Sequence, residues 1–138
     1  MTDPDYAGDG GEPYRVLGCC VHHQSHALPV RSPFNHRSFD ALNRTDAELD
    51  LVVPTPFAPP VGPHSEYARV PQTERWGTYI AHYPRFFYAI PKRYFYHVSG
   101  DSIQKRVTPY IERTFETPHD IVHVSDIYLD GYGMLNYC

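Results

Sequence analysis

The sequence predicts a mostly irregular, extended chain with a few short α-helices, room for one small β-hairpin or sheet, and no large independent core. Three observations lead there. The 138 residues include 14 prolines, about twice the average frequency. Residues 1–13 have the composition of an extended tail, and residues 54–71 contain little besides proline and small or polar residues. Each proline fixes φ and removes a backbone donor, which discourages long helices and central strands.

Changes in composition divide the chain into four segments. We expect an acidic extended tail at 1–13, then a strand, a loop and a short helix within 14–53. A proline-rich strap follows at 54–71, and an aromatic block with short helices occupies 72–138. Neither flank of the strap is long enough for a comfortable independent core, so the strap is not expected to be a linker between two domains.

The first half of the chain contains one predicted strand and one predicted helix. Residues 14–21 (YRVLGCCV) are short, apolar and β-compatible, which predicts a strand, and residues 22–36 follow as a loop. A helix is expected within 38–53, because Thr45 and Glu48 have the spacing of a capping box and a proline comes directly after residue 53.

The second half contains the longest predicted helix. Aromatic residues between 76 and 83 fit one helical face, and residues 92–98 fit a short strand. A helix over 102–116 is expected, with Pro109 kinking or restarting it. Residues 121–129 suit a buried strand or a short helix equally well. The apolar stripe of the 102–116 helix consists of Ile103, Val107, Tyr110, Ile111 and Phe115.

The densest chemical feature is the aromatic block, in which nine of the residues between Trp76 and Tyr96 are aromatic with arginine and lysine among them. These residue types are enriched at the energetic centres of protein interfaces. The core of a small domain and an RNA-stacking platform are the two alternatives. The predicted interface residues are Trp76, Tyr79, Tyr83, Arg85, Phe86, Phe87, Tyr94 and Phe95.

The charge distribution narrows the range of partners. The formal net charge is −4, and Asp3, Asp5, Asp9 and Glu12 account for all of it. A neutral body disfavours nucleic-acid binding, which normally needs a strong basic patch. No window approaches the apolar length of a transmembrane helix, so none is expected. We expect other protein subunits of a large complex as partners, with peripheral membrane or lipid contact as an open alternative.

Two clusters contain residue types that ligate metals, although no cofactor, metal or catalytic residue is predicted. His119 and His123 in the HDIVH sequence resemble the zinc-protease motif with Asp in place of Glu, a pattern that requires a helix. Cys19, Cys20 and His22 form the second cluster, but neighbouring cysteines on a strand point to opposite faces. A small metal-dependent hydrolase using the HDIVH motif is therefore an alternative function.

One short stretch resembles a known family. Residues 59–65 (PPVGPHS) are similar to the proline-rich PVGPSH segment of a small peripheral-arm accessory subunit of mitochondrial complex I. The resemblance implies a non-catalytic subunit that straps core subunits together, located in the mitochondrion and peripheral to the inner membrane. The leading prediction is thus a non-enzymatic accessory subunit of a respiratory-chain or ATP synthase assembly. An RNA-bound, mitoribosomal protein is the other alternative.

Overall fold

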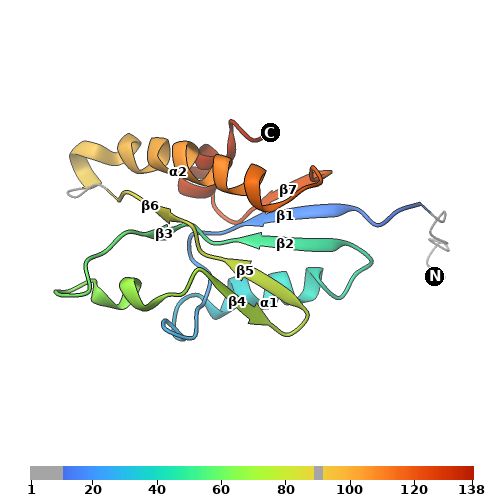
Figure 1. Ribbon diagram of the computed structural model, residues 1–138, viewed down its shortest axis with the longest axis horizontal. Helices are drawn as coiled ribbons and strands as arrows, with labels where there is room; N and C mark the ends of the chain where they lie inside the picture. The colour runs from blue at the N-terminus through green and yellow to red at the C-terminus, as the bar shows by residue number, and fades with distance from the viewer. Residues whose placement is uncertain (1–10, 89–91) are drawn as a thin grey trace, which may run out of the picture.

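A mixed five-stranded sheet with the order β4-β5-β2-β1-β7 organises the molecule (Figure 1). The computed structural model describes residues 11–88 and 92–138, without the side chains of 92–96. The elements are β1 (Arg15–Cys19), α1 (Pro33–Leu42), β2 (Glu48–Val52), β3 (Thr55–Pro56), the 3-10 helix η1 (Ser65–Arg69), β4 (Thr73–Trp76), β5 (Tyr79–His82), β6 (Arg85–Phe86), α2 (Lys92–Thr114), β7 (Ile121–Val124) and the π-helix η2 (Ile127–Tyr132).

The sheet is parallel except at one edge. β1 pairs with β2 on one side and with β7 on the other, β2 pairs with β5, and only β4 runs antiparallel. The chain moves outward from β1 through β2 to β5 and then returns beside β1 as β7. The two-residue strands β3 and β6 form a second parallel pair just beyond β2 and β5.

The two helices cover opposite faces of the sheet (Figure 1). Neighbouring residues of β1 point to opposite faces of the sheet. Val16 therefore packs in the buried cluster on the α1 side, and Leu17 packs in the buried cluster on the α2 side. Both side chains are buried. The prediction of an irregular chain without a large core is therefore wrong, since a parallel sheet closed by a helix on each face has a core on both sides.

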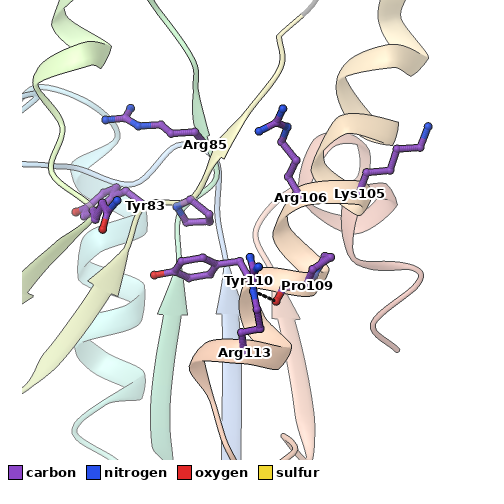
Figure 2. A pocket seen from close by; sticks show the side chains of 9 residues that line it. Tyr83, Arg85, Lys105, Arg106, Pro109, Tyr110 and Arg113 are labelled. Atoms are coloured by element: carbon purple, nitrogen blue, oxygen red, sulfur yellow. Dashed lines mark hydrogen bonds between the residues drawn. The ribbon is translucent and has the colours of Figure 1, made fainter.

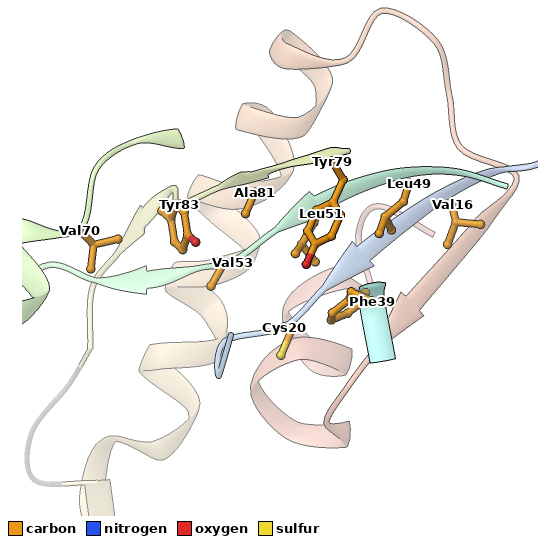
Figure 3. Close-up of a cluster of buried hydrophobic side chains, with 10 residues drawn as sticks. All are labelled: Val16, Cys20, Phe39, Leu49, Leu51, Val53, Val70, Tyr79, Ala81 and Tyr83. Carbon is orange, nitrogen blue, oxygen red and sulfur yellow. The ribbon is translucent and has the colours of Figure 1, made fainter. Parts of the chain in front are cut away.

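The α1 face has a core of mixed aliphatic and aromatic residues (Figure 3). Phe39 of α1 lies against Val16, Leu49 and Leu51 of β1 and β2. Tyr79 and Tyr83 complete the cluster toward β4 and β5.

The α2 face is built on the stripe predicted from the sequence. Ile103, Val107 and Ile111 of α2 are all fully buried against this face. Pro109 lies inside α2, where it offers no N–H, yet the helix continues through it. The Pro109 carbonyl accepts a hydrogen bond of 3.1 Å from Arg113 Nε (Figure 2).

Two of the locally predicted elements are confirmed, and the helix predicted within 38–53 is not. The strand at 14–21 is confirmed as β1, and the helix at 102–116 is confirmed as part of α2. The helix predicted within 38–53 is wrong: α1 begins earlier, with a proline in its first turn, and β2 occupies the end of that range. Leu49, Leu51 and Val52 form this interior strand, whose two buried faces remove the alternating pattern.

The aromatic block likewise forms no helix at 76–83. Trp76 and Tyr79 pair directly across the antiparallel hairpin of β4 and β5, which turns at Gly77 with φ of 58°. The strand expected at 92–98 is the beginning of α2. Residues 121–129 contain both alternatives in succession, β7 followed by η2. Within the described part of the chain, no helix has the length and apolar character needed to cross a bilayer.

Substituting Gly18 should destabilise the fold. A Cβ at this position of β1 would lie 2.6 Å from Phe39 Cε1 and 3.0 Å from Leu51 Cδ1. Overpacking of this kind costs about 1–3 kcal/mol, so Gly18→Ala should lower the free energy of unfolding by that amount in urea denaturation. The double variant Gly18→Ala/Phe39→Leu frees space at the contact and should recover part of the loss. Wild-type stability in Gly18→Ala would contradict this packing.

Candidate functional site

The carboxyl edge of the sheet is the place where this topology creates a crevice. β2 and β7 lie on either side of β1, and the connections that follow β1 and β7 leave toward opposite faces. In open α/β sheets, ligands bind outside the carboxyl ends of the strands at such a switch point. The arrowheads of β1 and β2 in Figure 1 point toward this edge.

A cavity of about 510 Å³ lies at this edge. Its walls come from the segments that follow β1, β3, β6 and β7, so four connections converge on it. The volume falls within the usual range for small-molecule sites. The lining residues are Val21, His22, Arg31, Pro56, Phe57, Ala58, Pro59, His64, Tyr67, Phe86, Tyr88 and Leu129; we call this space the carboxyl-edge cavity.

Arg31 is held in place at the cavity by two neighbours. Its Nη2 donates to His22 Nδ1 over 3.1 Å, and its guanidinium carbon lies 5.0 Å from the centre of the Tyr67 ring. Because arginine can only donate, His22 Nδ1 must be unprotonated in this arrangement. Within residues 11–88 and 97–138, no carboxylate forms an ion pair with Arg31. Among the residues that the structure describes, the guanidinium is therefore a fixed cation without a counter-charge.

The remaining walls of the carboxyl-edge cavity are mainly apolar and aromatic. Phe86 is buried beneath it, whereas the side chain of Phe57 is 67% exposed at the surface. Tyr67 and Tyr88 add rings with polar tips, and His64 contacts Tyr67 with a centroid distance of 6.2 Å. Aromatic walls next to a fixed cation suit a ligand that has both a ring and a negative charge.

The loop that carries His22 and Arg31 is anchored to the β4–β5 hairpin through Glu74. The Glu74 carboxylate accepts hydrogen bonds from Ser25 Oγ (3.1 Å) and from the His26 backbone N–H (3.1 Å). His26 also stacks on Trp76 with ring centroids 4.5 Å apart. These contacts fix the position of the loop, which forms one wall of the carboxyl-edge cavity.

Asp130 is a buried residue of η2 that follows Leu129, a lining residue of the carboxyl-edge cavity. Its Oδ1 accepts a 2.8 Å hydrogen bond from the Val21 backbone N–H, whereas its buried Oδ2 has no hydrogen-bond partner. Burial raises the pKa of Asp130 to about 7. The carboxyl group is thus largely protonated below neutral pH.

The cysteines of the second metal-ligand candidate point away from each other. Cys19 lies in the α2 core and Cys20 in the α1 core, as the strand alternation predicts. Burial raises the pKa of Cys20 to about 11 and that of Cys19 well above its usual value, so both are inert thiols. His22 lies in the cavity wall instead.

The HDIVH motif is not helical, so its predicted spacing on one helix face is wrong. His119 precedes β7 and is fully enclosed, with Nε2 2.8 Å from Asp50 Oδ2 and Nδ1 2.7 Å from the Tyr137 hydroxyl. His123 lies on β7, with its ring centroid 5.6 Å from that of Phe39. Among the residues that the structure describes, no three His, Cys, Asp or Glu side chains are arranged to hold a metal ion.

The predicted interface residues lie in several environments. Tyr79, Tyr83 and Phe86 are buried in the two cores, and Trp76 packs against them half-buried. Arg85 donates to backbone carbonyls, while Phe87 is 60% exposed. Tyr94 and Phe95 lie outside the described side chains. The hypothesis of contact with another chain stays a prediction, and Phe87 is the described aromatic residue of this set that could make it without unpacking the core.

Sequence reasoning missed Arg31, His64 and Tyr67, because it assigned them to a loop and to the proline-rich strap. The sequence signal for a site at these residues was indirect. Arg31 follows the predicted strand β1, and His64 and Tyr67 follow strands that were not predicted; parallel strands place the segments that follow them at one edge of the sheet. No protein-family model, no curated protein and no solved structure matches this chain.

The buried carboxyl group should make stability depend on pH. The pKa of Asp130 is raised from 3.8 in the unfolded chain to about 7 in the folded protein. The contribution of its protonated form to the free energy of unfolding is therefore full below about pH 4 and is lost as the pH rises through 7. Asp130→Asn keeps an acceptor for Val21 and cannot ionise. We expect it to be more stable than wild type at pH 8 by about 2–4 kcal/mol.

The measurement is urea denaturation of wild type and variant from pH 4 to pH 8. The difference in the free energy of unfolding between Asp130→Asn and wild type should shrink toward zero as the pH falls to 4. The comparison cancels contributions common to both proteins, including that of His23, whose pKa burial lowers to about 4. Asp46→Asn, at an exposed position, is the matched control and should show no such dependence. A pH-independent difference for Asp130→Asn would contradict the burial argument.

Proposed function

We propose that this domain binds a small phosphorylated ring compound, of the nucleotide or sugar phosphate class, in the carboxyl-edge cavity. The observation that carries the proposal is the position of Arg31 at the switch point of a doubly wound sheet, as a fixed cation to which the described residues provide no carboxylate partner. The guanidinium presents its donors in a planar fork that matches phosphate oxygens.

The shape of the cavity supports a ring as the second part of the ligand. Phe57, Tyr67 and Tyr88 provide aromatic surfaces at the opening and walls, and such surfaces pack against nucleobases or the apolar faces of sugars. The binding mode differs from that of the dinucleotide fold in one respect. The segment 20–32 between β1 and α1 contains no glycine, so Arg31 takes the role that a glycine-rich phosphate loop has in that fold.

The accessory-subunit role, the metal-dependent hydrolase and the RNA-bound protein stay predictions from the sequence. The accessory-subunit role was motivated by the prediction that residues 54–71 form an extended strap. In the structure this segment forms β3, η1 and much of the wall of the carboxyl-edge cavity. This arrangement favours ligand binding over strapping as the role of that segment.

Arg31→Ala should weaken ligand binding. The probes are adenosine diphosphate, uridine diphosphate and glucose 6-phosphate, each titrated calorimetrically into the purified protein, with amide NMR shifts followed at Val21, Phe57 and Tyr67. At least one probe should bind with shifts at these positions. Loss of a charge-assisted hydrogen bond should weaken its affinity about tenfold or more in Arg31→Ala.

The matched control is Arg37→Ala, which removes an exposed arginine from α1 outside the cavity. It should bind the same probe with wild-type affinity. Failure of all three probes to bind at millimolar concentration, or equal affinity of Arg31→Ala and wild type, would overturn the proposal.

A further inference from the structure

A second cavity, of about 410 Å³, lies between the strand segment 83–85 and helix α2 (Figure 2). It shares no lining residue with the carboxyl-edge cavity. Figure 2 shows Tyr83 and Arg85 on the strand side and the other labelled residues on α2, with the Arg85 guanidinium directed away from α2 and the Lys105 side chain directed away from the strands. The lining residues are Gln72, Tyr83, Pro84, Arg85, Lys105, Arg106, Pro109, Tyr110 and Arg113; we call this space the α2 cavity.

The lining of the α2 cavity is cationic. Arg85, Lys105, Arg106 and Arg113 all contribute to it, and it contains no acidic residue. In the described parts of the chain, none of these four forms an ion pair, because the ion pairs there use other cations. Four cations that have no ion-pair partner among the described residues create a local positive potential around this space, in a protein whose formal net charge is −4.

The cations from α2 have the spacing of a single helix face. Arg106 and Arg113 are seven residues apart, which is two helical turns, so they lie above one another on the side that faces the cavity. Lys105 lies beside Arg106 and lines a neighbouring cavity of about 330 Å³ as well. That neighbouring cavity also includes Asp101, so the purely cationic lining is confined to the α2 cavity.

Arg85 is fixed before any ligand arrives. Its Nη1 donates to the Tyr67 carbonyl over 2.7 Å, and its Nη2 donates to the Val70 carbonyl. These bonds occupy only part of its donor set. Burial lowers the pKa of Arg85, as expected for a cation that has lost water without gaining a counter-charge.

The uncharged lining of the α2 cavity is held in a fixed position. Tyr83 and Pro84 are buried, and Tyr110 is held by a 3.0 Å hydrogen bond between its hydroxyl and His82 Nδ1. These groups form a fixed, largely apolar floor. A compact anion with several oxygens and more than one negative charge complements such a site better than a single carboxylate does.

We propose that the α2 cavity is a phosphate-binding site, with Arg106 and Arg113 as its main ligands, Arg85 on the opposite wall and Lys105 at the rim. The phosphate belongs to a soluble phosphate or diphosphate compound or to a phospholipid headgroup. The site is independent of the proposed function, because it uses different residues on the other side of β6.

The experiment measures binding of inorganic pyrophosphate by calorimetry at low ionic strength, in protein carrying Arg31→Ala so that the carboxyl-edge cavity does not contribute. Pyrophosphate should bind in this background. Adding Arg106→Ala or Arg113→Ala should weaken the affinity about tenfold or more, since each removes a charge-assisted hydrogen bond. Adding Arg37→Ala instead, which removes the same charge from α1 on the opposite face of the sheet, should leave the affinity for pyrophosphate unchanged.

A second arm identifies the source of the phosphate. Sedimentation with vesicles of phosphatidylcholine alone is compared with sedimentation with phosphatidylcholine mixed with phosphatidic acid. Vesicle binding that needs phosphatidic acid and is lost in Arg106→Ala supports the site with a lipid headgroup as ligand, and pyrophosphate binding alone supports it with a soluble ligand. If neither probe binds, or if Arg37→Ala weakens binding as much as Arg106→Ala, the proposal is overturned.

Discussion

The burial of β1 on both faces and both edges is the constraint on which the rest of the structure depends. β1 pairs with β2 and β7, contributes Val16 to the α1 core and contributes Leu17 to the α2 core. A strand enclosed in this way must satisfy its backbone groups within the sheet and its side chains within two layers. Helices on both faces and the return of the chain to β7 follow from that need, and the return creates the switch point at the carboxyl edge.

The two ends of the sheet are stabilised in different ways. At the amino end, Asp50 accepts from Arg15 and His119, which connects β1, β2 and the entry to β7 through side chains. At the carboxyl end, Glu74 and Arg85 bind backbone groups of neighbouring segments, while Arg31 has no carboxylate partner in the described part of the chain. Polar groups at the amino end are thus paired within the chain, and those at the carboxyl end leave donors available, which agrees with ligand binding at that end.

Some of this could be read from the sequence, and the reasons differ by element. The α2 stripe was predicted because Ile103, Val107 and Ile111 face a single core, which preserves the helical period. The site was not predicted, because Arg31, Tyr67 and Phe86 are far apart in the chain and meet only where parallel strands end at a common edge. The prolines misled for a related reason. Pro56 ends β3, and Pro54 and Pro84 lie in the short connections between strands, where a missing N–H costs little, and not in an extended strap.

The sequence by itself determined the strand at β1, the apolar stripe of α2, the opposite orientation of Cys19 and Cys20, and the lack of glycine in the segment 20–32. Each of these depends on neighbouring residues and on a local period. Only the tertiary structure decided that the aromatic block is a hairpin and part of two cores, that the proline-rich segment lines a cavity, and that cations from β6 and α2 share one space. Those outcomes depend on which strands pair, and pairing across long sequence separations leaves no periodic pattern in the chain.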